Sequence, residues 1–444
     1  MSKIVLIGAN HAGTAAANTI LDNYPEHQVV IFDANSNISY LGCGTALYIG
    51  GQIDGTEGLF YSSKENFEAK KAVVHMETSV NRIDFEGKTV YALDKNGGEL
   101  TETYDRLIIA TGSLPITPNI KGIDTPRVEC VKLFQDGQKI FELLGQSDIR
   151  TVAVVGAGYI GVEIVEAVRR RGKKPLLFEA LSTSLASYYD DWFTHDMDKV
   201  LSDNGVELHY GELVQEIEGS GKVTGIVTNK GSYQVDMVIM AIGFKPNNSL
   251  AAKELETLPN GAYRVNLKQE TGRSGVYAIG DCASVYSNAL QDRAYIALAT
   301  NAVRSGIVAG HNAAGTPLEG AGVQGSNGIC IWGYKMVSTG LNLEAAKKAG
   351  FTPSYTQFED MQKPAFIKED NNRVKIRIVY DKNTRRVLGA QMASYQDISM
   401  GIHLFSLAIE EKLTIDRLAL LDIFFLPHFN QPYNYITMAA LSAK

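Results

Sequence analysis

Two residues near the N-terminus have side chains suited to redox and proton-transfer chemistry, Cys43 and His11. Cys43 lies between Gly42 and Gly44, just before a helix-like stretch that starts at about Thr45. A cysteine near a helix N-terminus has a lowered thiol pKa, and its thiolate can attack a peroxide oxygen to give a sulfenic acid. His11 opens an expected helix, where the dipole favours the neutral imidazole, so it could pass a proton to a departing oxygen.

The spacing of the cysteines limits the form that such chemistry can take. Cys130, Cys282 and Cys330 lie far from Cys43, so a local redox disulfide of the CxxxxC type is excluded. A thiolate/sulfenate cycle at a single cysteine fits better. The alternatives are that Cys43 is a small buried hydrophobe and that His11 only shapes its turn. We expect Cys130 and Cys330 to be packing residues and assign no role to Cys282.

A glycine motif in the middle of the chain indicates a nucleotide site. Gly156, Gly158 and Gly161 follow a clean apolar strand and open a helix, which is the context that this motif requires. The glycines permit a tight turn and a close approach of pyrophosphate to the helix N-terminus. Glu179 follows at the end of the next strand, where its carboxylate can accept from a ribose 2′-OH and would repel a 2′-phosphate. The motif therefore favours NADH over NADPH, although an incidental glycine turn with a solvated Glu179 is the alternative.

A second, less regular copy lies at the N-terminus. It reads Gly8-Ala9-Asn10-His11-Ala12-Gly13, with asparagine where the middle glycine is expected. Asparagine tolerates a left-handed backbone better than most residues, so we expect the turn to survive. Asp33 ends the following strand and is a plausible ribose acceptor for the adenosine half of FAD. Two copies in one chain indicate two bound nucleotides.

The elements that position these motifs predict an α/β fold. Residues 3–33 and 151–179 each read as a strand–helix–strand crossover, and apolar strands at 107–112 and 237–243 close the two units. A further buried strand at 276–281 runs into the turn Gly280-Asp281. From about residue 320, alternating segments at 374–380 and 386–391 predict antiparallel strands, with helices at 398–411 and 414–421. We therefore expect two Rossmann-like dinucleotide-binding domains and a C-terminal α+β domain, bounded as 1–113 with 245–319, 114–244, and 320–444.

Composition excludes several other classes of protein. The chain has 444 residues and a formal net charge of −7, with a sequence pI near 5.7, which argues against nucleic-acid or membrane-surface binding. No apolar run reaches the roughly 18 residues of a membrane span, and no secretory leader is evident. Four separated cysteines suit a reducing cytosol and argue against a zinc site, so we expect a soluble cytoplasmic protein without bound metal.

Taken together, these residues resemble the pyridine nucleotide–disulfide oxidoreductase superfamily. Within it, the chain resembles the single-cysteine group of NADH oxidases, NADH peroxidases and CoA-disulfide reductases, and most closely the water-forming NADH oxidases. The resemblance covers nearly the whole chain. The segments that carry it are His11-Ala12-Gly13-Thr14, Ser39-Tyr40-Leu41-Gly42-Cys43-Gly44, Ala110-Thr111-Gly112-Ser113, Gly156-Ala157-Gly158-Tyr159-Ile160-Gly161, Gly280-Asp281, Leu298-Ala299-Thr300-Asn301-Ala302 and Pro427-His428-Phe429-Asn430-Gln431-Pro432-Tyr433-Asn434-Tyr435.

The resemblance implies two sets of cofactor-binding residues and a homodimer built on the C-terminal domain. The set implied for FAD is Gly8, Asn10, His11, Ala12, Gly13, Asp33, Cys43, Val80, Ala110, Thr111, Gly112, Ser113, Lys132, Asp281, Ala299 and Thr300, with Phe425 approaching the partner's flavin. The set implied for NADH is Gly156, Gly158, Tyr159, Ile160, Gly161, Glu179, Tyr188, Gly243 and Gly328.

The resemblance also implies a reaction. NADH would reduce FAD, dioxygen would be reduced to peroxide level, and the Cys43 thiolate would complete its reduction to water with a proton from His11. A second NADH would restore the thiolate. NADH peroxidase shares nearly every motif and stays open, CoA-disulfide reductase fits less well because no basic cluster lies near Cys43, and a redox-sensing flavoprotein is the alternative that is not an enzyme.

Overall fold

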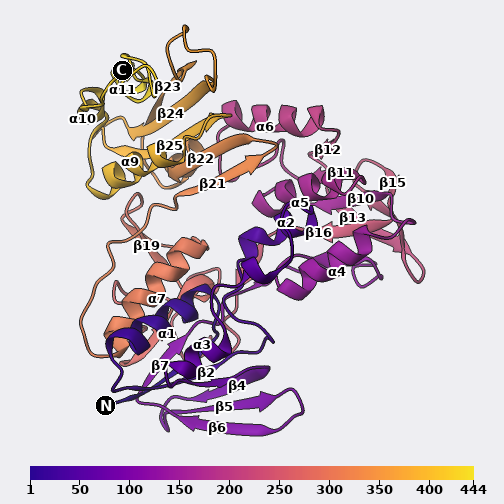
Figure 1. Ribbon diagram of the computed structural model, residues 1–444, viewed down its shortest axis with the longest axis vertical. Coiled ribbons are helices and arrows are strands. Elements are labelled where there is room, and N and C mark those ends of the chain that lie inside the picture. Colours follow the sequence, from indigo (N-terminus) through magenta and orange to yellow (C-terminus); the bar gives the residue numbers. More distant parts are fainter.

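The computed structural model describes residues 1–444 and contains two parallel sheets of matching topology (Figure 1). The first has the order β18-β7-β1-β2-β3 and the second the order β12-β11-β10-β16-β9. Strands β7-β1-β2-β3 of the first correspond to β16-β10-β11-β12 of the second, and the fifth strand of each sheet comes from a different part of the chain. The strands of the first sheet are β1 (Lys3–Ile7), β2 (Gln28–Phe32), β3 (Val73–His75), β7 (Arg106–Ile109) and β18 (Val276–Ala278). Those of the second are β9 (Val128–Cys130), β10 (Thr151–Val155), β11 (Lys174–Glu179), β12 (Glu207–Tyr210) and β16 (Met237–Met240).

The expected crossovers are confirmed in both sheets. In the first, β1 pairs in parallel with β2 and β7, and helix α1 (His11–Asn23) makes the crossover. In the second, β10 pairs in parallel with β11 and β16, with helix α5 (Tyr159–Arg170) as the crossover. Strands buried on both faces, such as β10 and β16, carry continuous apolar runs because helices or small sheets cover each side.

Small antiparallel sheets and further helices complete the two units. The small sheets are formed by β4 (Thr78–Asp84), β5 (Thr89–Asp94) and β6 (Glu99–Thr103); by β13 (Val214–Gly219), β14 (Val223–Thr228) and β15 (Ser232–Gln234); by β8 (Ser113–Pro115) and β17 (Phe244–Pro246); and by β19 (Val285–Ser287) and β20 (Asp292–Ala294). The helices are α2 (Thr45–Ile49), α3 (Lys64–Ala69), α4 (Phe134–Leu144), α6 (Asp191–Asp203) and α7 (Ala299–Ala313), with 3₁₀ turns η1 (Gly42–Gly44), η2 (Glu57–Leu59) and η3 (Gly280–Cys282).

The C-terminal region is the α+β unit that the alternating segments predict. Its antiparallel sheet has the order β21-β22-β25-β24-β23, and helices pack beside it (Figure 1, orange to yellow). The strands are β21 (Asn327–Ile331), β22 (Tyr334–Gly340), β23 (Pro353–Met361), β24 (Arg373–Asp381) and β25 (Val387–Ser394). The helices are α8 (Leu343–Lys348), α9 (Ser399–Glu410), α10 (Ile415–Ala419) and α11 (Tyr435–Leu441).

Strand β18 and helix α7 return the chain to the N-terminal unit after the second sheet is complete. β18 pairs with β7, and α7 packs along α1. We therefore propose the discontinuous boundaries already given, with residues 245–319 joining residues 1–113. None of the helices has the length and apolar character needed to cross a membrane.

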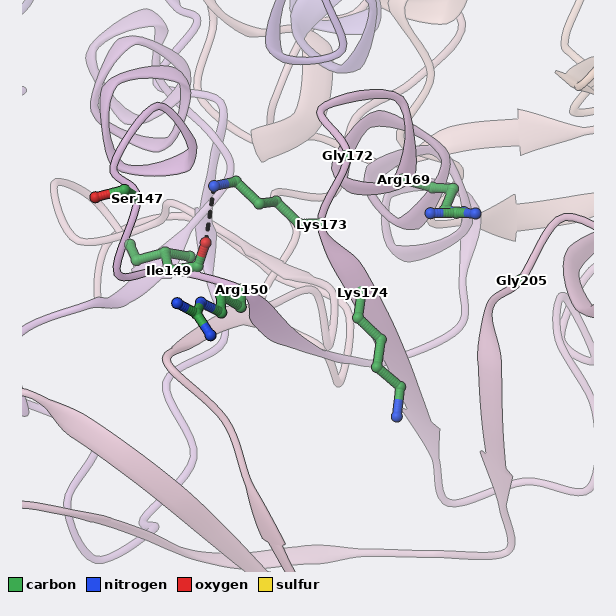
Figure 2. Close-up of a pocket in the computed structure, with 8 residues that line it drawn as sticks. All are labelled: Ser147, Ile149, Arg150, Arg169, Gly172, Lys173, Lys174 and Gly205. Carbon is green, nitrogen blue, oxygen red and sulfur yellow. Dashed lines mark hydrogen bonds between the residues drawn. The ribbon is translucent and has the colours of Figure 1, made fainter.

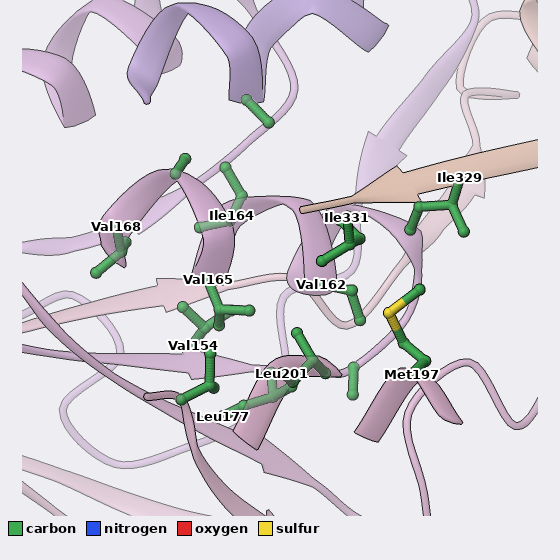
Figure 3. Close-up of a cluster of buried hydrophobic side chains, with 14 of the residues drawn as sticks. Val154, Val162, Ile164, Val165, Val168, Leu177, Met197, Leu201, Ile329 and Ile331 are labelled. Carbon is green, nitrogen blue, oxygen red and sulfur yellow. The ribbon is translucent and has the colours of Figure 1, made fainter. Parts of the chain in front are cut away.

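The second nucleotide unit and the C-terminal unit share one hydrophobic core (Figure 3). Ile329 and Ile331 of β21 pack with Val162 of α5 and Met197 of α6 in this cluster. All four side chains are at most 5% exposed. Helix α5 is therefore enclosed between its own sheet and a strand of another unit.

A buried ion pair also links these two units. The Arg377 guanidinium on β24 lies 3.1 Å from the carboxylate of Asp190, and both side chains are nearly inaccessible. The Gln391 side chain on β25 donates to the same carboxylate at 2.9 Å and accepts the Asp190 backbone N–H at 2.8 Å. Because a buried charge must be paired and hydrogen-bonded, this contact fixes the start of α6 against the C-terminal sheet.

Candidate functional site

The two glycine turns have the same geometry. Gly8 and Gly156 both adopt a left-handed backbone, with φ of +100° and +102°. A Cβ on Gly13 would collide with the carbonyl oxygen of Gly8, and a Cβ on Gly161 with that of Gly156, each well inside 3.0 Å. The first and last glycines of each motif are thus required for the turn and for the seating of the helix on it.

The middle positions, Asn10 and Gly158, both have extended backbones. Their φ and ψ angles are −84° and −154° for Asn10, and −73° and −172° for Gly158. The turn at Asn10 survives as expected, but the reason given from the sequence was wrong, because no left-handed conformation is needed there. A Cβ on Gly158 would meet only the Tyr188 ring, at 3.9 Å, so this glycine leaves open space on the cavity side of the turn.

Asp33 and Glu179 each hold the glycine turn of their own unit. One carboxylate oxygen of Asp33 accepts the N–H of Ala9 at 2.7 Å, and one of Glu179 accepts the N–H of Ala157 at 2.8 Å. The other oxygen of Glu179 accepts the N–H of Leu181 at 2.9 Å. Burial raises the pKa of Asp33, opposed by hydrogen bonds from the backbone N–H groups of Asn35 and Ala9 and from the Asn35 side chain. The Asp33 oxygen bonded to Ala9 and the two oxygens of Glu179 each keep a lone pair with which they could accept a ribose hydroxyl.

One cavity of about 1350 Å³ brings both turns together with Cys43 and His11. Most of the predicted site residues line it: Gly8, Asn10, His11, Ala12, Gly13, Asp33, Cys43, Val80, Ala110, Thr111, Gly112, Ser113, Lys132, Asp281, Ala299, Gly156, Gly158, Tyr159, Ile160, Glu179, Tyr188, Gly243 and Gly328. Three predicted residues do not. Gly161 lies behind its turn, Thr300 is exposed on α7, and Phe425 is half-exposed on the C-terminal unit.

Cys43 faces the cavity from the 3₁₀ turn η1, immediately before helix α2. The residue is exposed to solvent, yet the surrounding protein atoms partly desolvate its thiol. This burial raises the pKa of the thiol, and the carboxylate of Glu163 raises it further. The expectation of a lowered pKa was therefore wrong: α2 has only five residues, and its dipole does not outweigh burial and a nearby carboxylate.

His11 is the first residue of α1, as predicted, and its ring lines the cavity. Burial lowers the pKa of His11, while Asp281 raises it and Lys132 lowers it again. The expected neutral imidazole is thus confirmed in direction, although burial is the main cause. The Nδ1 atom of His11 lies 2.9 Å from the hydroxyl of Tyr61.

A polar chain links Lys132, Ser113 and Asp281 on one wall of the cavity. The Lys132 ammonium donates to the Ser113 hydroxyl at 2.7 Å, and that hydroxyl donates to Asp281 at 2.8 Å. Lys132 also lies 3.5 Å from the Asp281 carboxylate. The sequence named these three residues separately, and the fold connects them across 168 positions.

Sequence reasoning missed Glu163, which lines the same cavity from helix α5. Burial raises its pKa to about 7, with a further contribution from Glu166. A signal was present, because Tyr159 and Glu163 are four residues apart and lie on the same face of the helix.

The remaining cysteines differ in setting. Cys282 is fully buried in the core, whereas Cys330 is exposed. The predicted packing role of Cys330 was therefore wrong. Side chains alternate along β21, so that Ile329 and Ile331 point inward and Cys330 points outward.

A second cavity, of about 500 Å³, lies at the opposite end of α5 and is lined by basic side chains (Figure 2). Lys173 donates to the carbonyls of Gln146 and Ile149, at 2.9 and 2.8 Å. Arg169 donates to the carbonyl of Asn204 at 3.0 Å, and Lys174 is paired with Glu207 at 2.6 Å. Lys173 and Arg169 therefore bind carbonyls that follow the ends of α4 and α6, where positive charge is stabilising, and Lys174 is paired with a carboxylate on strand β12.

Known protein families match nearly the whole length of this chain. The model of the pyridine nucleotide-disulphide oxidoreductase family matches residues 2–306, and that of the family's dimerisation domain matches residues 327–434. The chain belongs to the pyridine nucleotide-disulphide oxidoreductase family. Membership confirms the predicted α/β fold with an antiparallel C-terminal unit.

Individual members of the family are similar over their full lengths. The chain is 56% identical to an NADH oxidase of Lactococcus lactis subsp. cremoris, with all of both chains covered, and 57% identical to an NADH oxidase of Streptococcus pyogenes, again with full coverage. Among solved structures, a water-forming NADH oxidase from Lactobacillus brevis bound to NADH is 37% identical, with a TM-score of 0.96 over 100% of this chain and 98% of that one.

Proposed function

We propose that the protein is an FAD-dependent NADH oxidase that reduces dioxygen to water and uses Cys43 as its redox centre. The observation that carries this proposal is the single cavity in which two nucleotide turns, a cysteine and a neutral histidine meet. Full-length similarity to NADH oxidases, one of them water-forming, supports it.

The N-terminal turn and its wall fit FAD. Asp33 would accept from the ribose, and the first turn of α1 would offer backbone N–H groups to the pyrophosphate. Ser113, Lys132 and Asp281 form a connected polar wall that would hold the polar atoms of the cofactor. When bound, FAD would accept the hydride of NADH and pass electrons to dioxygen.

The second turn fits NADH. Gly158 leaves room for the pyrophosphate, and the two oxygens of Glu179 can accept from an unmodified ribose. Tyr188 packs edge-on against Tyr159, with ring centroids 4.6 Å apart, and both rings line the cavity. These residues would position NADH on the side of the cavity opposite the FAD turn.

The states of Cys43 and His11 suggest how the protein would complete the reduction to water. The sulfur of Cys43 attacks one oxygen of hydrogen peroxide, forming an S–O bond as the O–O bond breaks. Because its lowered pKa keeps His11 neutral, we infer that the imidazole N–H donates a proton to the departing oxygen, which leaves as water. The thiol proton of Cys43 passes to water, and a proton from water restores the imidazole. Cys43 becomes a sulfenic acid, and the two electrons of a second NADH, with one proton taken up, release its oxygen as another water and regenerate the thiol.

The C-terminal unit supports a homodimer. Several large apolar side chains of residues 420–433 are exposed there: Leu420, Phe424, Phe425, Leu426, Phe429 and Tyr433. Since this region belongs to the family's dimerisation domain, we propose that a second copy of the chain covers them and brings Phe425 towards the partner's FAD site. Four free cysteines and the absence of disulfides fit the cytoplasm as the place of action.

The decisive experiment compares the purified protein with Cys43→Ser in air, measuring NADH, dioxygen and hydrogen peroxide. We expect the unaltered protein to consume two NADH per dioxygen without releasing peroxide, and Cys43→Ser to consume one and release peroxide. Water formation by Cys43→Ser without peroxide release would refute the role of Cys43. Turnover that requires added peroxide, with little in air, would identify an NADH peroxidase instead.

A further inference from the structure

Tyr61 contacts His11 and no other residue of the proposed chemistry. Its hydroxyl lies 2.9 Å from Nδ1 of His11, and the two rings are stacked, with centroids 5.8 Å apart and an interplanar angle of 8°. The phenol therefore occupies Nδ1 and leaves Nε2 as the ring nitrogen available for proton transfer. A single side chain thus fixes both the plane and the hydrogen-bonding state of the ring.

The backbone of Tyr61 is tied to the loop that carries Cys43. The buried hydroxyl of Ser39 accepts the N–H of Tyr61 at 3.1 Å and that of Ser62 at 2.7 Å, and donates to the Ser62 carbonyl at 2.8 Å. The N–H of Leu41 donates to the carbonyl of Leu59 at 2.8 Å. Residues 59–62 are therefore hydrogen-bonded to residues 39–41, which fixes the backbone of Tyr61 relative to the loop that carries Cys43.

We propose that Tyr61 is a positioning residue for His11, whose hydroxyl donates to Nδ1 and so places the imidazole proton on Nε2. In a neutral imidazole one nitrogen donates and the other accepts, so a donor at Nδ1 selects this tautomer. A phenol is a good donor, and burial raises the pKa of Tyr61, so its proton stays on oxygen. The inference deepens the proposed function, since it rests on His11 acting at the same cavity.

The direction of the hydrogen bond has a measurable sign. A donor at Nδ1 stabilises neutral His11 and disfavours the imidazolium, which has no acceptor. Removing the hydroxyl should therefore raise the pKa of His11. If instead Nδ1–H donated to Tyr61, the imidazolium would be favoured and removal would lower the pKa. Asp281, which raises the pKa of His11, and Lys132, which lowers it, are the charged groups that act on the ring and are unchanged by the substitution.

The test is Tyr61→Phe in the FAD-loaded enzyme, which keeps the ring stacking and removes only the hydroxyl. The pH dependence of His11 carbethoxylation, followed by mass spectrometry of the peptide, reports its pKa without turnover. We expect the midpoint to rise by roughly one unit, as loss of one hydrogen bond to the neutral form implies. Water-forming turnover should fall roughly tenfold or more, while the rate of FAD reduction by NADH is unchanged.

Tyr24→Phe is the matched control, because Tyr24 makes the same kind of contact with His311, at 2.7 Å, and neither residue lines the cavity. It should leave the midpoint of His11 and the turnover unchanged. A midpoint for Tyr61→Phe that falls or stays constant would overturn the inference. If the carbethoxylation midpoint rises while the unaltered protein proves not to be an oxidase, the positioning role stands and only the proposed function fails. Should Tyr61→Phe lose FAD, the carbethoxylation midpoints of the FAD-free forms of both proteins are compared, with the same rise expected.

Discussion

Replacing the last glycine of each motif by alanine should impair FAD binding in one case and NADH binding in the other. Gly13 and Gly161 are each the third residue of a helix, α1 and α5. At such a position Gly→Ala would ordinarily stabilise a helix by about 0.5–1 kcal/mol. Here the new Cβ would have to retreat by more than an ångström before its distance to the carbonyl oxygen of Gly8 or Gly156 reached 3.0 Å.

That displacement has to be absorbed by the helix or the turn. Overpacking of this kind costs about 1–3 kcal/mol, so the helix gain is overturned and each variant should be less stable than the parent. A shift of about 1 Å in a positioned ligand can reduce activity roughly a hundredfold. We expect Gly13→Ala to lose FAD and Gly161→Ala to keep FAD while its KM for NADH rises at least roughly tenfold.

Gly158→Ala is the control, because its Cβ meets only Tyr188, at 3.9 Å, and its backbone needs no positive φ. Stability should be unchanged, and only the KM for NADH should rise. The assays are flavin absorbance after gel filtration, urea denaturation, and steady-state kinetics with NADH. Stabilised Gly→Ala variants, or FAD loss from Gly161→Ala, would contradict the assignment of one turn to each nucleotide.

Two further variants test the electrostatics of the cavity. Glu179→Gln should raise kcat/KM for NADPH relative to NADH roughly tenfold, because repulsion between unit charges about 4 Å apart is on the order of 1–4 kcal/mol. NADH itself should bind less well, because the amide offers a single acceptor oxygen to the two N–H groups that the carboxylate binds. An unchanged NADPH/NADH ratio would exclude the ribose contact. Alkylation of Cys43 by iodoacetamide in the FAD-free protein should have its midpoint above the usual thiol pKa, since burial and Glu163 both disfavour the thiolate. The pKa of Glu163 is about 7, so it is ionised where Cys43 titrates, and Glu163→Gln should lower the midpoint. An equal midpoint in the two proteins would show that Glu163 does not act on the thiol.

The sequence predicted those features that depend on local spacing. Strands 3–7 and 151–155 and the helices that follow them were identified because buried runs, glycines and an acidic strand end lie within about thirty residues. Features that depend on contacts between distant segments could not be predicted this way. The hydroxyl of Tyr61 reaches His11 across 50 positions, and Glu163 changes the pKa of Cys43 across the cavity. The short length of α2, by contrast, had a local signal that was missed, because Gly50 and Gly51 follow Ile49 directly.

The shared core around β21 means that residues 114–244, the proposed NADH-binding unit, are not a transferable module. Ile329 and Ile331 cover α5, and the hydroxyl of Tyr159 is bonded to Asn327 of the same strand. Cutting the chain at residues 114 and 244 would expose these apolar surfaces and leave the start of α5 without its partner. Transplantation of the proposed NADH site into another flavoprotein would therefore have to carry the β21–β22 hairpin along with the turn, the helix and Glu179.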